Sequence, residues 1–185
     1  MSKHSAISVC VFCASSDHLD DRYNSTAIAL GRQMALRGLR LVYGGGNNGL
    51  MGLLSETVHD TGGEIIGVIP KGLNDLGYAY SEADEMIITD GMRDRKAIME
   101  ERADGFIGLP GGFGTLEEML EIITLRQLEM LDKPIVFINV GDFFNGLIEQ
   151  FERGYAERFI EDRCRELYFV TDSVVEALDY IERNA

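Results

Sequence analysis

Short apolar runs alternate with longer helical patterns along this chain of 185 residues, and the alternation constrains the fold more than any other feature. The runs that predict strands are 7–13, 39–43, 64–69, 85–88, 105–109, 134–139 and 167–170. The patterns that predict helices are 20–37, 48–60, 93–102, 115–130, 143–157 and 172–183. Several strands are apolar on both faces, which is typical of a sheet covered by helices on both sides. The order predicts a doubly wound, Rossmann-like α/β fold with a mostly parallel sheet, in one domain spanning 1–185.

In such a sheet, every loop from a strand to the next helix emerges at the same edge, where α/β proteins bind their ligands. The loops after the first, second, fourth and fifth predicted strands read CASSD, YGGGNNG, TDGMRDRK and LPGGFGTLEE. They hold small-residue clusters and the densest basic cluster of the chain, so we expect them to line one crevice. Ser15 of the first loop is a candidate substrate-binding residue. The segment 71–83 is the least regular part, and we expect a loop over the site there.

The formal net charge of −14 excludes the basic footprint of a nucleic-acid-binding protein and disfavours an anionic membrane surface. A small anionic ligand is still allowed, because backbone N–H groups and a few local cations can bind a phosphate within an acidic protein. Nothing approaches the ~18 apolar residues of a membrane span. The apolar run 6–14 fits a strand and loop better than a signal peptide, so we expect a cytoplasmic protein.

Three cysteines are too few for a disulfide framework. Cys10 and Cys13 form a C-x-x-C string within a predicted strand, where positions three apart point to opposite faces. We therefore expect buried, reduced thiols at these positions and at Cys164. The histidines, at positions 4, 18 and 59, show no metal-ligand spacing, and we expect neither a metal nor a cofactor.

The first glycine motif, YGGGNNGLMG at 43–52, follows a predicted strand and begins a helix. Gly44, Gly45 and Gly46 would let the backbone approach a ligand, and the helix N-terminus would favour an anion. The motif is not the G-x-G-x-x-G of a dinucleotide site. We expect contact with a phosphate or a sugar, and the alternative is a tight turn that packs the helix closely on the strand.

The second glycine motif, PGGFGTLEE at 110–118, also connects a strand and a helix. Gly111, Gly112 and Gly114 can present N–H groups to a phosphate, and the hydroxyl of Thr115 can join them. The motif lacks the lysine of a triphosphate P-loop, so a monophosphate fits better.

Glu118 allows two interpretations. Thr115 and Glu118 have the spacing of a capping box, in which each side chain bonds the other's backbone N–H at a helix start, and spacing alone favours this cap. A carboxylate one turn into the helix, beside a phosphate loop, is also well placed to face a bound ribose. Glu117 should point elsewhere, because neighbouring helical residues diverge by ~100°.

The third motif, MRDRKAIM at 92–99, places Arg93, Arg95 and Lys96 in the first turn of a predicted helix. Basic residues there oppose the helix dipole, and such a local inconsistency is a mild indication of function. The alternative is a solvated, charged turn.

Together these motifs resemble the Lonely Guy family, the cytokinin riboside 5′-monophosphate phosphoribohydrolases. The resemblance implies a Rossmann-like homodimer that releases a free base and ribose 5-phosphate from an adenosine-type monophosphate. It implies Arg95 and Glu118 as the catalytic pair, a nucleotide loop at 111–118, and Lys96 and Thr124 near the ligand. Many members are labelled lysine decarboxylases, but the motifs give no basis for pyridoxal phosphate chemistry. The chain departs from the family at 93–94, where members often carry His-Glu, and at Gly77, where they often carry Glu.

For the chemistry, we expect Glu118 to stabilise the oxocarbenium character of the ribose and to orient water. Arg95 would hold the ribose or the phosphate and keep Glu118 ionised. Molybdenum cofactor carriers resemble the chain in fold and glycine loops, so a carrier is the alternative, and a nucleotide-sensing module is a third interpretation.

For assembly, we expect a homodimer with the 115–131 helix in its interface. One apolar stripe should face the core, made of Leu116, Leu120, Ile123 and Gln127. Further apolar residues should broaden this stripe beyond what one face of the sheet covers, so that part of it faces a partner. These residues are Met119, Ile122, Met130 and Leu131.

Overall fold

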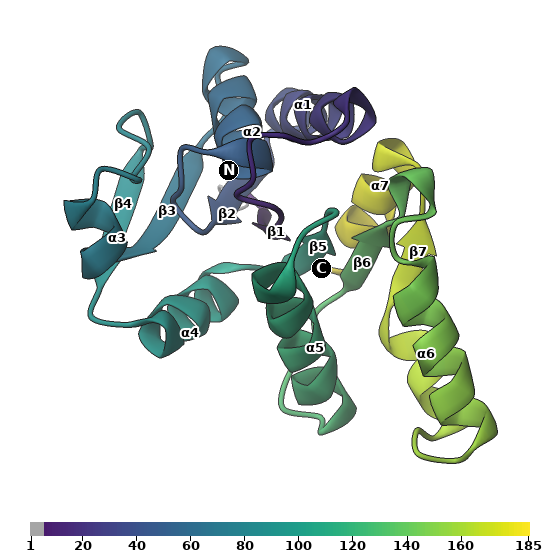
Figure 1. The fold of residues 1–185 in the computed structure, drawn as a ribbon. Helices are drawn as coiled ribbons and strands as arrows, with labels where there is room; N and C mark the ends of the chain where they lie inside the picture. Colours follow the sequence, from purple (N-terminus) through teal and green to yellow (C-terminus); the bar gives the residue numbers. More distant parts are fainter. Residues whose placement is uncertain (1–5) are drawn as a thin grey trace, which may run out of the picture.

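The computed structural model describes residues 6–185 as a seven-stranded parallel sheet between two layers of helices (Figure 1). The strands are β1 (Ser8–Phe12), β2 (Arg40–Tyr43), β3 (Ile65–Pro70), β4 (Glu85–Thr89), β5 (Gly105–Gly108), β6 (Ile135–Ile138) and β7 (Phe169–Thr171). They lie in the order β4-β3-β2-β1-β5-β6-β7. The predicted fold class is confirmed, and each predicted strand is present. His4 lies outside the described residues.

The helices are α1 (Asp21–Leu36), α2 (Gly49–Asp60), α3 (Lys71–Asp75), α4 (Met92–Arg102), α5 (Phe113–Gln127), α6 (Asn145–Ala156) and α7 (Val174–Asn184), with short 3-10 helices η1 (Val140–Asp142) and η2 (Asp162–Leu167). In Figure 1, α1, α2 and α7 cover one face of the sheet and α4, α5 and α6 cover the other. Within the described residues, no helix combines the length and the apolar character needed to cross a membrane.

The core consists of two apolar clusters, one on each face of the sheet. Cys13 belongs to the cluster beneath α1 and α2, whereas Cys10 belongs to the cluster beneath α4 and α5. The predicted opposite orientation of the two thiols is therefore confirmed, and both side chains are buried, as is Cys164. Burial raises the pKa of the Cys10 and Cys13 thiols, so these groups are neutral.

The strand order explains how distant segments meet. The chain moves outward from the central strand β1 through β2 and β3 to the edge strand β4, and α4 then returns beneath β3, β2 and β1 to reach β5 on the other side of β1. The adjacent strands β1 and β5 mark the point where the strand order reverses, which is the usual ligand site of such sheets. The path of α4 carries its first turn toward that point.

The segment 71–83 is more regular than predicted, because Lys71–Asp75 forms α3. Gly77 has φ +81° and ends this helix. The N–H of Gly77 donates to the carbonyl of Asn74 at 2.9 Å, and the N–H of Tyr78 donates to the carbonyl of Leu73 at 3.2 Å. These two bonds form a Schellman motif, which commonly brings an apolar pair together across the helix end.

Candidate functional site

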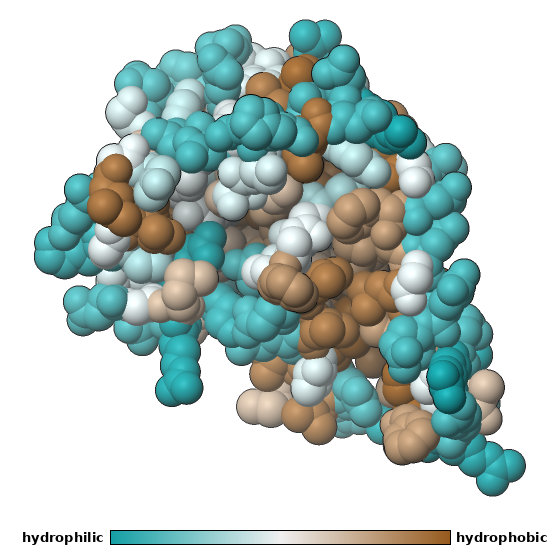
Figure 2. All heavy atoms as spheres, in the orientation of Figure 1, coloured by the Kyte–Doolittle hydropathy of each residue, from teal (hydrophilic) through white to brown (hydrophobic). Residues whose placement is uncertain are grey.

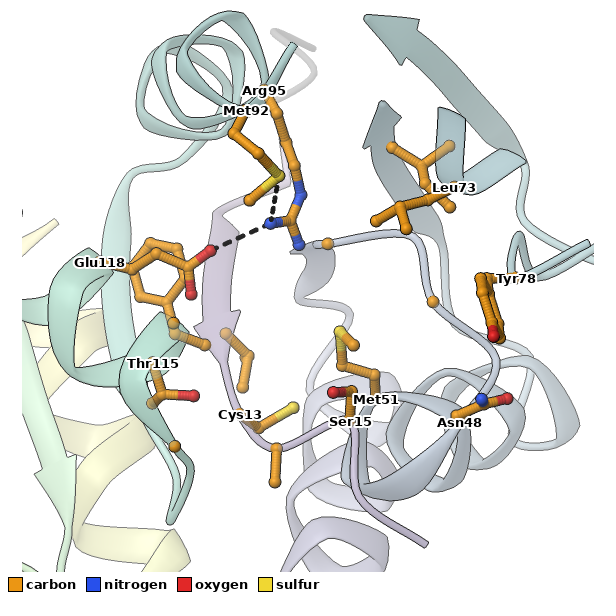
Figure 3. Close-up of a pocket in the computed structure, with 18 of the residues that line it drawn as sticks. Cys13, Ser15, Asn48, Met51, Leu73, Tyr78, Met92, Arg95, Thr115 and Glu118 are labelled. Carbon is orange, nitrogen blue, oxygen red and sulfur yellow. Dashed lines mark hydrogen bonds and ion pairs between the residues drawn. The ribbon is translucent and has the colours of Figure 1, made fainter. Parts of the chain in front are cut away.

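A cavity of about 530 Å³ lies at the edge of the sheet where the strands end, and Figure 3 shows its lining. All four loops predicted to converge contribute to it, with Ser15 after β1, Gly44 and Gly46 after β2, Arg95 from α4, and 112–115 with Glu117 and Glu118 at the start of α5. The segment 71–83 also contributes, since Leu73 and Tyr78 lie across the cavity from Glu118 and Thr115. The prediction of one crevice built by these loops is borne out by the geometry.

Arg95 and Glu118 form a buried ion pair in this cavity. Nη1 of Arg95 donates to Oε1 of Glu118 at 3.2 Å, and the two side chains are only 10% and 9% exposed. One residue comes from α4 and the other from α5, so the pair exists only because both helices pack on the same face of the sheet. The interpretation of Arg95 as part of a solvated turn is wrong, whereas Arg93 is exposed.

Further contacts orient the Arg95 guanidinium. Its Nε donates to the carbonyl of Val68 at 3.1 Å, and Sδ of Met92 lies 3.9 Å from Nη1 (Figure 3). Because one edge of the guanidinium is bound to the backbone of β3, the remaining nitrogens face Glu118 and the cavity. A planar group fixed in this way can hold a ligand oxygen in a defined direction.

Glu118 is a buried carboxyl group of the cavity. Burial raises its pKa from 4.5 to about 7, and the charge of Arg95 opposes this shift without cancelling it. The expectation that Arg95 simply keeps Glu118 ionised is therefore too strong, because desolvation is the larger effect. A carboxyl group with a pKa near neutrality can both accept and donate a proton at physiological pH.

The predicted capping box is not formed. The helix α5 begins at Phe113, two residues earlier than predicted, and its N-cap is Gly112 with no side-chain cap. Thr115 is thus the third residue of the helix, and its buried side chain lines the cavity. The Glu118 carboxylate bonds Arg95 instead of the backbone at the helix start. Of the two interpretations of Glu118, only the one in which its carboxylate faces the cavity therefore remains.

The first turn of α5 is open. Within residues 6–185, no hydrogen-bond partner is found for the backbone N–H groups of Phe113, Gly114 or Thr115. These groups lie at the positive end of a 15-residue helix and at the wall of the cavity. Such an arrangement is a ready site for a phosphate group.

The predicted glycines divide into two groups. Gly44, Gly46, Gly112 and Gly114 line the cavity, but Gly45 and Gly111 do not. Gly45 has φ +72° and packs on Ile69, and a Cβ on Gly111 would lie 2.1 Å from the Thr115 hydroxyl oxygen. Gly45 and Gly111 are therefore needed for the shape of the loops.

Lys96 and Thr124, implied by the family resemblance, lie outside the cavity of this chain. Nζ of Lys96 is paired with Glu117 and lies 2.7 Å from Glu121, so it joins α4 to the outer side of α5. The Thr124 hydroxyl donates to the carbonyl of Leu120 at 2.7 Å. Neither residue reaches the cavity formed by a single chain.

Sequence reasoning missed the apolar wall of the cavity, which consists of Met51, Ile69, Leu73, Tyr78, Met92 and Met99. The Schellman motif at Gly77 places Leu73 and Tyr78 side by side in this wall. The signal was present in the sequence as a leucine and a tyrosine on either side of a helix-ending glycine. At position 77, the left-handed backbone favours glycine, so a glutamate there would be strained in this loop conformation.

The predicted core stripe of α5 is only partly right, because Leu116 and Ile123 are partly buried against the core cluster but are not its most buried residues. Met119 and Ile122 are buried against the sheet, and so is Leu131 beyond the helix, whereas Leu120 is 39% exposed. Of the residues expected to face the core, Leu120 therefore faces outward, and Met119 and Ile122, expected to face a partner, form the buried side of the helix.

Comparison with known proteins agrees with the geometry. Residues 51–181 match the model of a protein family described as "Possible lysine decarboxylase". The chain is 41% identical over 174 residues to cytokinin riboside 5′-monophosphate phosphoribohydrolase LOG4 of Arabidopsis thaliana, covering 94% of this chain and 81% of that protein. It is also 41% identical to the probable cytokinin riboside 5′-monophosphate phosphoribohydrolase LOGL1 of Oryza sativa subsp. japonica, covering 95% of this chain and 78% of that protein.

Solved structures show the same fold at lower identity. The molybdenum cofactor binding protein from Rippkaea orientalis superposes with a TM-score of 0.75 at 20% identity and covers 98% of each chain. The Moco carrier protein from Chlamydomonas reinhardtii gives a TM-score of 0.73 at 20% identity and covers 97% of each chain. At this identity, the likeness shows the fold alone.

Proposed function

Because the chain belongs to the Lonely Guy family of cytokinin riboside 5′-monophosphate phosphoribohydrolases, we propose that it hydrolyses the N-glycosidic bond of adenosine-type nucleoside 5′-monophosphates. The products are the free base and ribose 5-phosphate. The observation that carries the proposal is the buried Arg95–Glu118 pair in a cavity that also holds an open helix N-terminus.

The cavity accommodates the three parts of such a substrate. The 5′-phosphate lies at the first turn of α5, where free N–H groups and the Thr115 hydroxyl are available to it. We assign the base to the apolar wall near Leu73 and Tyr78, two residues that lie across the cavity from Glu118 and Thr115 (Figure 3). The ribose then lies between them, beside Glu118 and Arg95.

The chemistry follows from the state of Glu118. As the bond between C1′ and the base breaks, the ribose gains oxocarbenium character, which the ionised carboxylate stabilises at close range. The same carboxylate takes a proton from the attacking water, and its pKa of about 7 suits that role near neutral pH. Arg95 orients the ribose or phosphate oxygens and the carboxylate. The net reaction adds the hydroxyl of water to C1′ and its hydrogen to the base.

Two alternatives fit the residues less well. A pyridoxal phosphate decarboxylase needs a lysine that holds the cofactor as a Schiff base. In the described part of the chain, Lys71, Lys96 and Lys133 all lie outside the cavity. A carrier that binds without reaction has no evident use for a buried carboxyl group whose pKa lies near 7.

One assay tests the proposal. The protein is incubated with adenosine monophosphate, and free adenine and ribose 5-phosphate are measured by chromatography; the same assay with an isopentenyl-substituted monophosphate compares the two bases. Adenosine without the phosphate should give a kcat/KM lower by at least ~10²-fold, because about two charge-assisted hydrogen bonds are lost. Binding of both monophosphates without any release of base would contradict the hydrolase and favour the carrier.

We further propose a homodimer in which the outer side of α5 lies in the interface. Figure 2 shows apolar side chains gathered over this part of the surface. The exposed residues include Phe113, Leu120, Leu128 and Met130, and Phe113 is 93% exposed. An apolar surface of this kind at the rim of the cavity supports contact with a second copy.

Sedimentation at micromolar concentration tests this assembly. The wild-type protein should have about twice the mass of the 20.6 kDa chain. Leu120→Glu should give a monomer, and Ile28→Glu, at an exposed apolar residue of α1, should leave the dimer intact. A wild-type monomer with full activity would contradict the dimer and any role for it in catalysis.

A further inference from the structure

Gly44 makes an unusually close approach to the Arg95 side chain. It is the first residue after β2, and a Cβ placed on it would lie 1.7 Å from Nη2 and 2.9 Å from Cζ of Arg95. Two heavy atoms that are not bonded to each other cannot lie at the shorter distance. The guanidinium therefore occupies the space that any other residue at position 44 would fill with its side chain.

The backbone of Gly44 does not itself require glycine. Gly44 is not among the described glycines with positive φ, which include its neighbour Gly45 at +72°. An alanine could thus adopt the same backbone conformation at position 44. The atoms that would have to move belong to the far end of a flexible side chain, so the conflict is with the position of the guanidinium and not with the fold.

In its position beside Gly44, the guanidinium is bonded to both β3 and α5. The hydrogen-bonded register between β2 and β3 ends at the pair Tyr43–Gly67, one residue before Val68. The Val68 carbonyl accepts a hydrogen bond from Nε of Arg95, and the Met51 sulfur lies 3.3 Å from the position of the missing Cβ. A guanidinium displaced from Gly44 would have to give up the Val68 bond, the Glu118 contact, or both.

We propose that Gly44 is a positioning residue for the proposed hydrolysis, because its missing side chain forms the socket that holds the Arg95 guanidinium against Glu118. The inference rests on the proposed roles of Arg95 and Glu118. It assigns to this glycine a task different from contact with a phosphate or a sugar, since the group that needs the space is a side chain of the protein itself.

A methyl group in the socket has a measurable effect on Glu118. It moves the Arg95 charge away from Glu118, so the factor that lowers the pKa of this carboxyl weakens and the pKa rises above its value of about 7. The ionised fraction of Glu118 at neutral pH then falls, and the acidic limb of the pH–rate profile moves to higher pH. Once the Arg95 side chain is removed, the nearest atom to the methyl group is the Met51 sulfur at 3.3 Å, which belongs to a flexible side chain and needs to move by only a few tenths of an ångström.

A double-mutant cycle tests the socket. The variants are Gly44→Ala, Arg95→Ala, the double variant, and Gly146→Ala as the control, since a Cβ on Gly146 of α6 meets nothing within 4 Å. Gly44→Ala should lose at least ~10²-fold in kcat with a smaller change in KM, and its acidic limb should move upward, whereas Gly146→Ala should match the wild type. The double variant should lose no more activity than Arg95→Ala alone.

The same cycle is followed by thermal unfolding and by NMR titration of the Glu118 carboxyl, which need no activity. Gly44→Ala should lower the melting temperature in the presence of Arg95 and leave it unchanged or raise it in the Arg95→Ala background. If Gly44→Ala fails to fold and the double variant folds, the socket is supported as well. If the changes in melting temperature from Gly44→Ala and Arg95→Ala add up in the double variant, or if Gly44→Ala keeps full activity, the proposed role of Gly44 is wrong. A non-additive cycle in a protein that releases no base would keep the socket and refute the hydrolase.

Discussion

Two glycine-rich junctions between a strand and a helix line the same cavity, one after β2 and one after β5, and they differ in which groups bond the N–H groups of the helix start. At α2, the N–H of Gly49 donates to Oδ1 of Asp17 at 2.7 Å, and the N–H of Met51 donates to the carbonyl of Ala14 at 3.3 Å. At α5, the corresponding groups have no partner within residues 6–185. The protein's own carboxylate completes one helix N-terminus, while the other is available to an external anion.

The interiors of the two helices differ in the same way. The sixth residue of α2 is Leu54, which packs in the core, and the sixth residue of α5 is Glu118, which faces the cavity. Helical geometry directs both positions inward. Two junctions with similar loops therefore differ in what they offer the cavity. The proposed function and the proposed socket assign the packing of Arg95 to the β2–α2 junction, and a phosphate site with a carboxyl group to the β5–α5 junction.

The largest effect on activity should come from the carboxyl group of the β5–α5 junction, which we call the open junction because its first N–H groups have no partner within residues 6–185. Glu118→Gln keeps the shape of the side chain and removes its charge and its proton chemistry. Hydrolysis of adenosine monophosphate should fall by at least ~10²-fold with folding and nucleotide binding retained. Glu56→Gln, at an exposed position of α2, is the control and should keep full activity. Full turnover by Glu118→Gln would show that the two junctions do not differ in catalysis.

The same substitution should change the dependence of stability on pH. Because the pKa of Glu118 is about 7 in the folded protein and 4.5 in the unfolded chain, its stabilising contribution is complete below pH 4.5 and is lost as the pH rises through 7. Glutamine resembles the protonated form at every pH. Glu118→Gln should therefore match the wild type at low pH and exceed it at pH 8, by roughly 3 kcal/mol in the free energy of unfolding.

Thermal or denaturant unfolding at pH 4.5 and pH 8 measures this difference. A Glu118→Gln protein that is less stable than the wild type at pH 8 would mean that attraction to Arg95 outweighs desolvation. In that case the carboxyl group would be ionised at all working pH values, and its role would be electrostatic rather than acid–base.

A smaller effect should follow from placing a carboxylate at the open junction. A Cβ on Gly114 would meet nothing within 4 Å, so Gly114→Asp fits sterically and supplies α5 with an anion like the one that α2 already has. The variant should keep or raise its melting temperature and should lose roughly tenfold or more in kcat/KM by competing with the phosphate. Gly114→Asn controls for size without charge. Equal kcat/KM for Gly114→Asp and the wild type would place the phosphate elsewhere.

The smallest effect should come from the β2–α2 junction, where groups of the protein already bond the helix N-terminus. Asp17→Ala removes the carboxylate that bonds Gly49, and it should cost about 1 kcal/mol of stability, as the loss of a helix cap does. The melting temperature should fall by roughly 2–4 °C in a chain of this size. The KM for the monophosphate should stay near its wild-type value. A large rise in KM without destabilisation would instead identify α2 as the phosphate site.

The sequence by itself determined the layout of the fold and the chemistry available to the site. Apolar periodicity is a local property, so the seven strands and the longer helices followed from it, together with the edge where the loops meet. The parallel order of the strands then placed Arg95 and Glu118 at one crevice. The glycine motifs indicated an anion site, although they did not distinguish between the two junctions.

Only the tertiary structure decided how these groups are used, because the deciding contacts join residues far apart in the chain. Arg95 meets Glu118 across 23 positions and Val68 across 27, and Asp17 meets Gly49 across 32. Burial, which raises the pKa of Glu118, and the packing that buries Met119 and exposes Leu120 depend on the whole assembled sheet. Spacing and propensity describe neighbours in sequence, whereas desolvation and steric fit are set by neighbours in space.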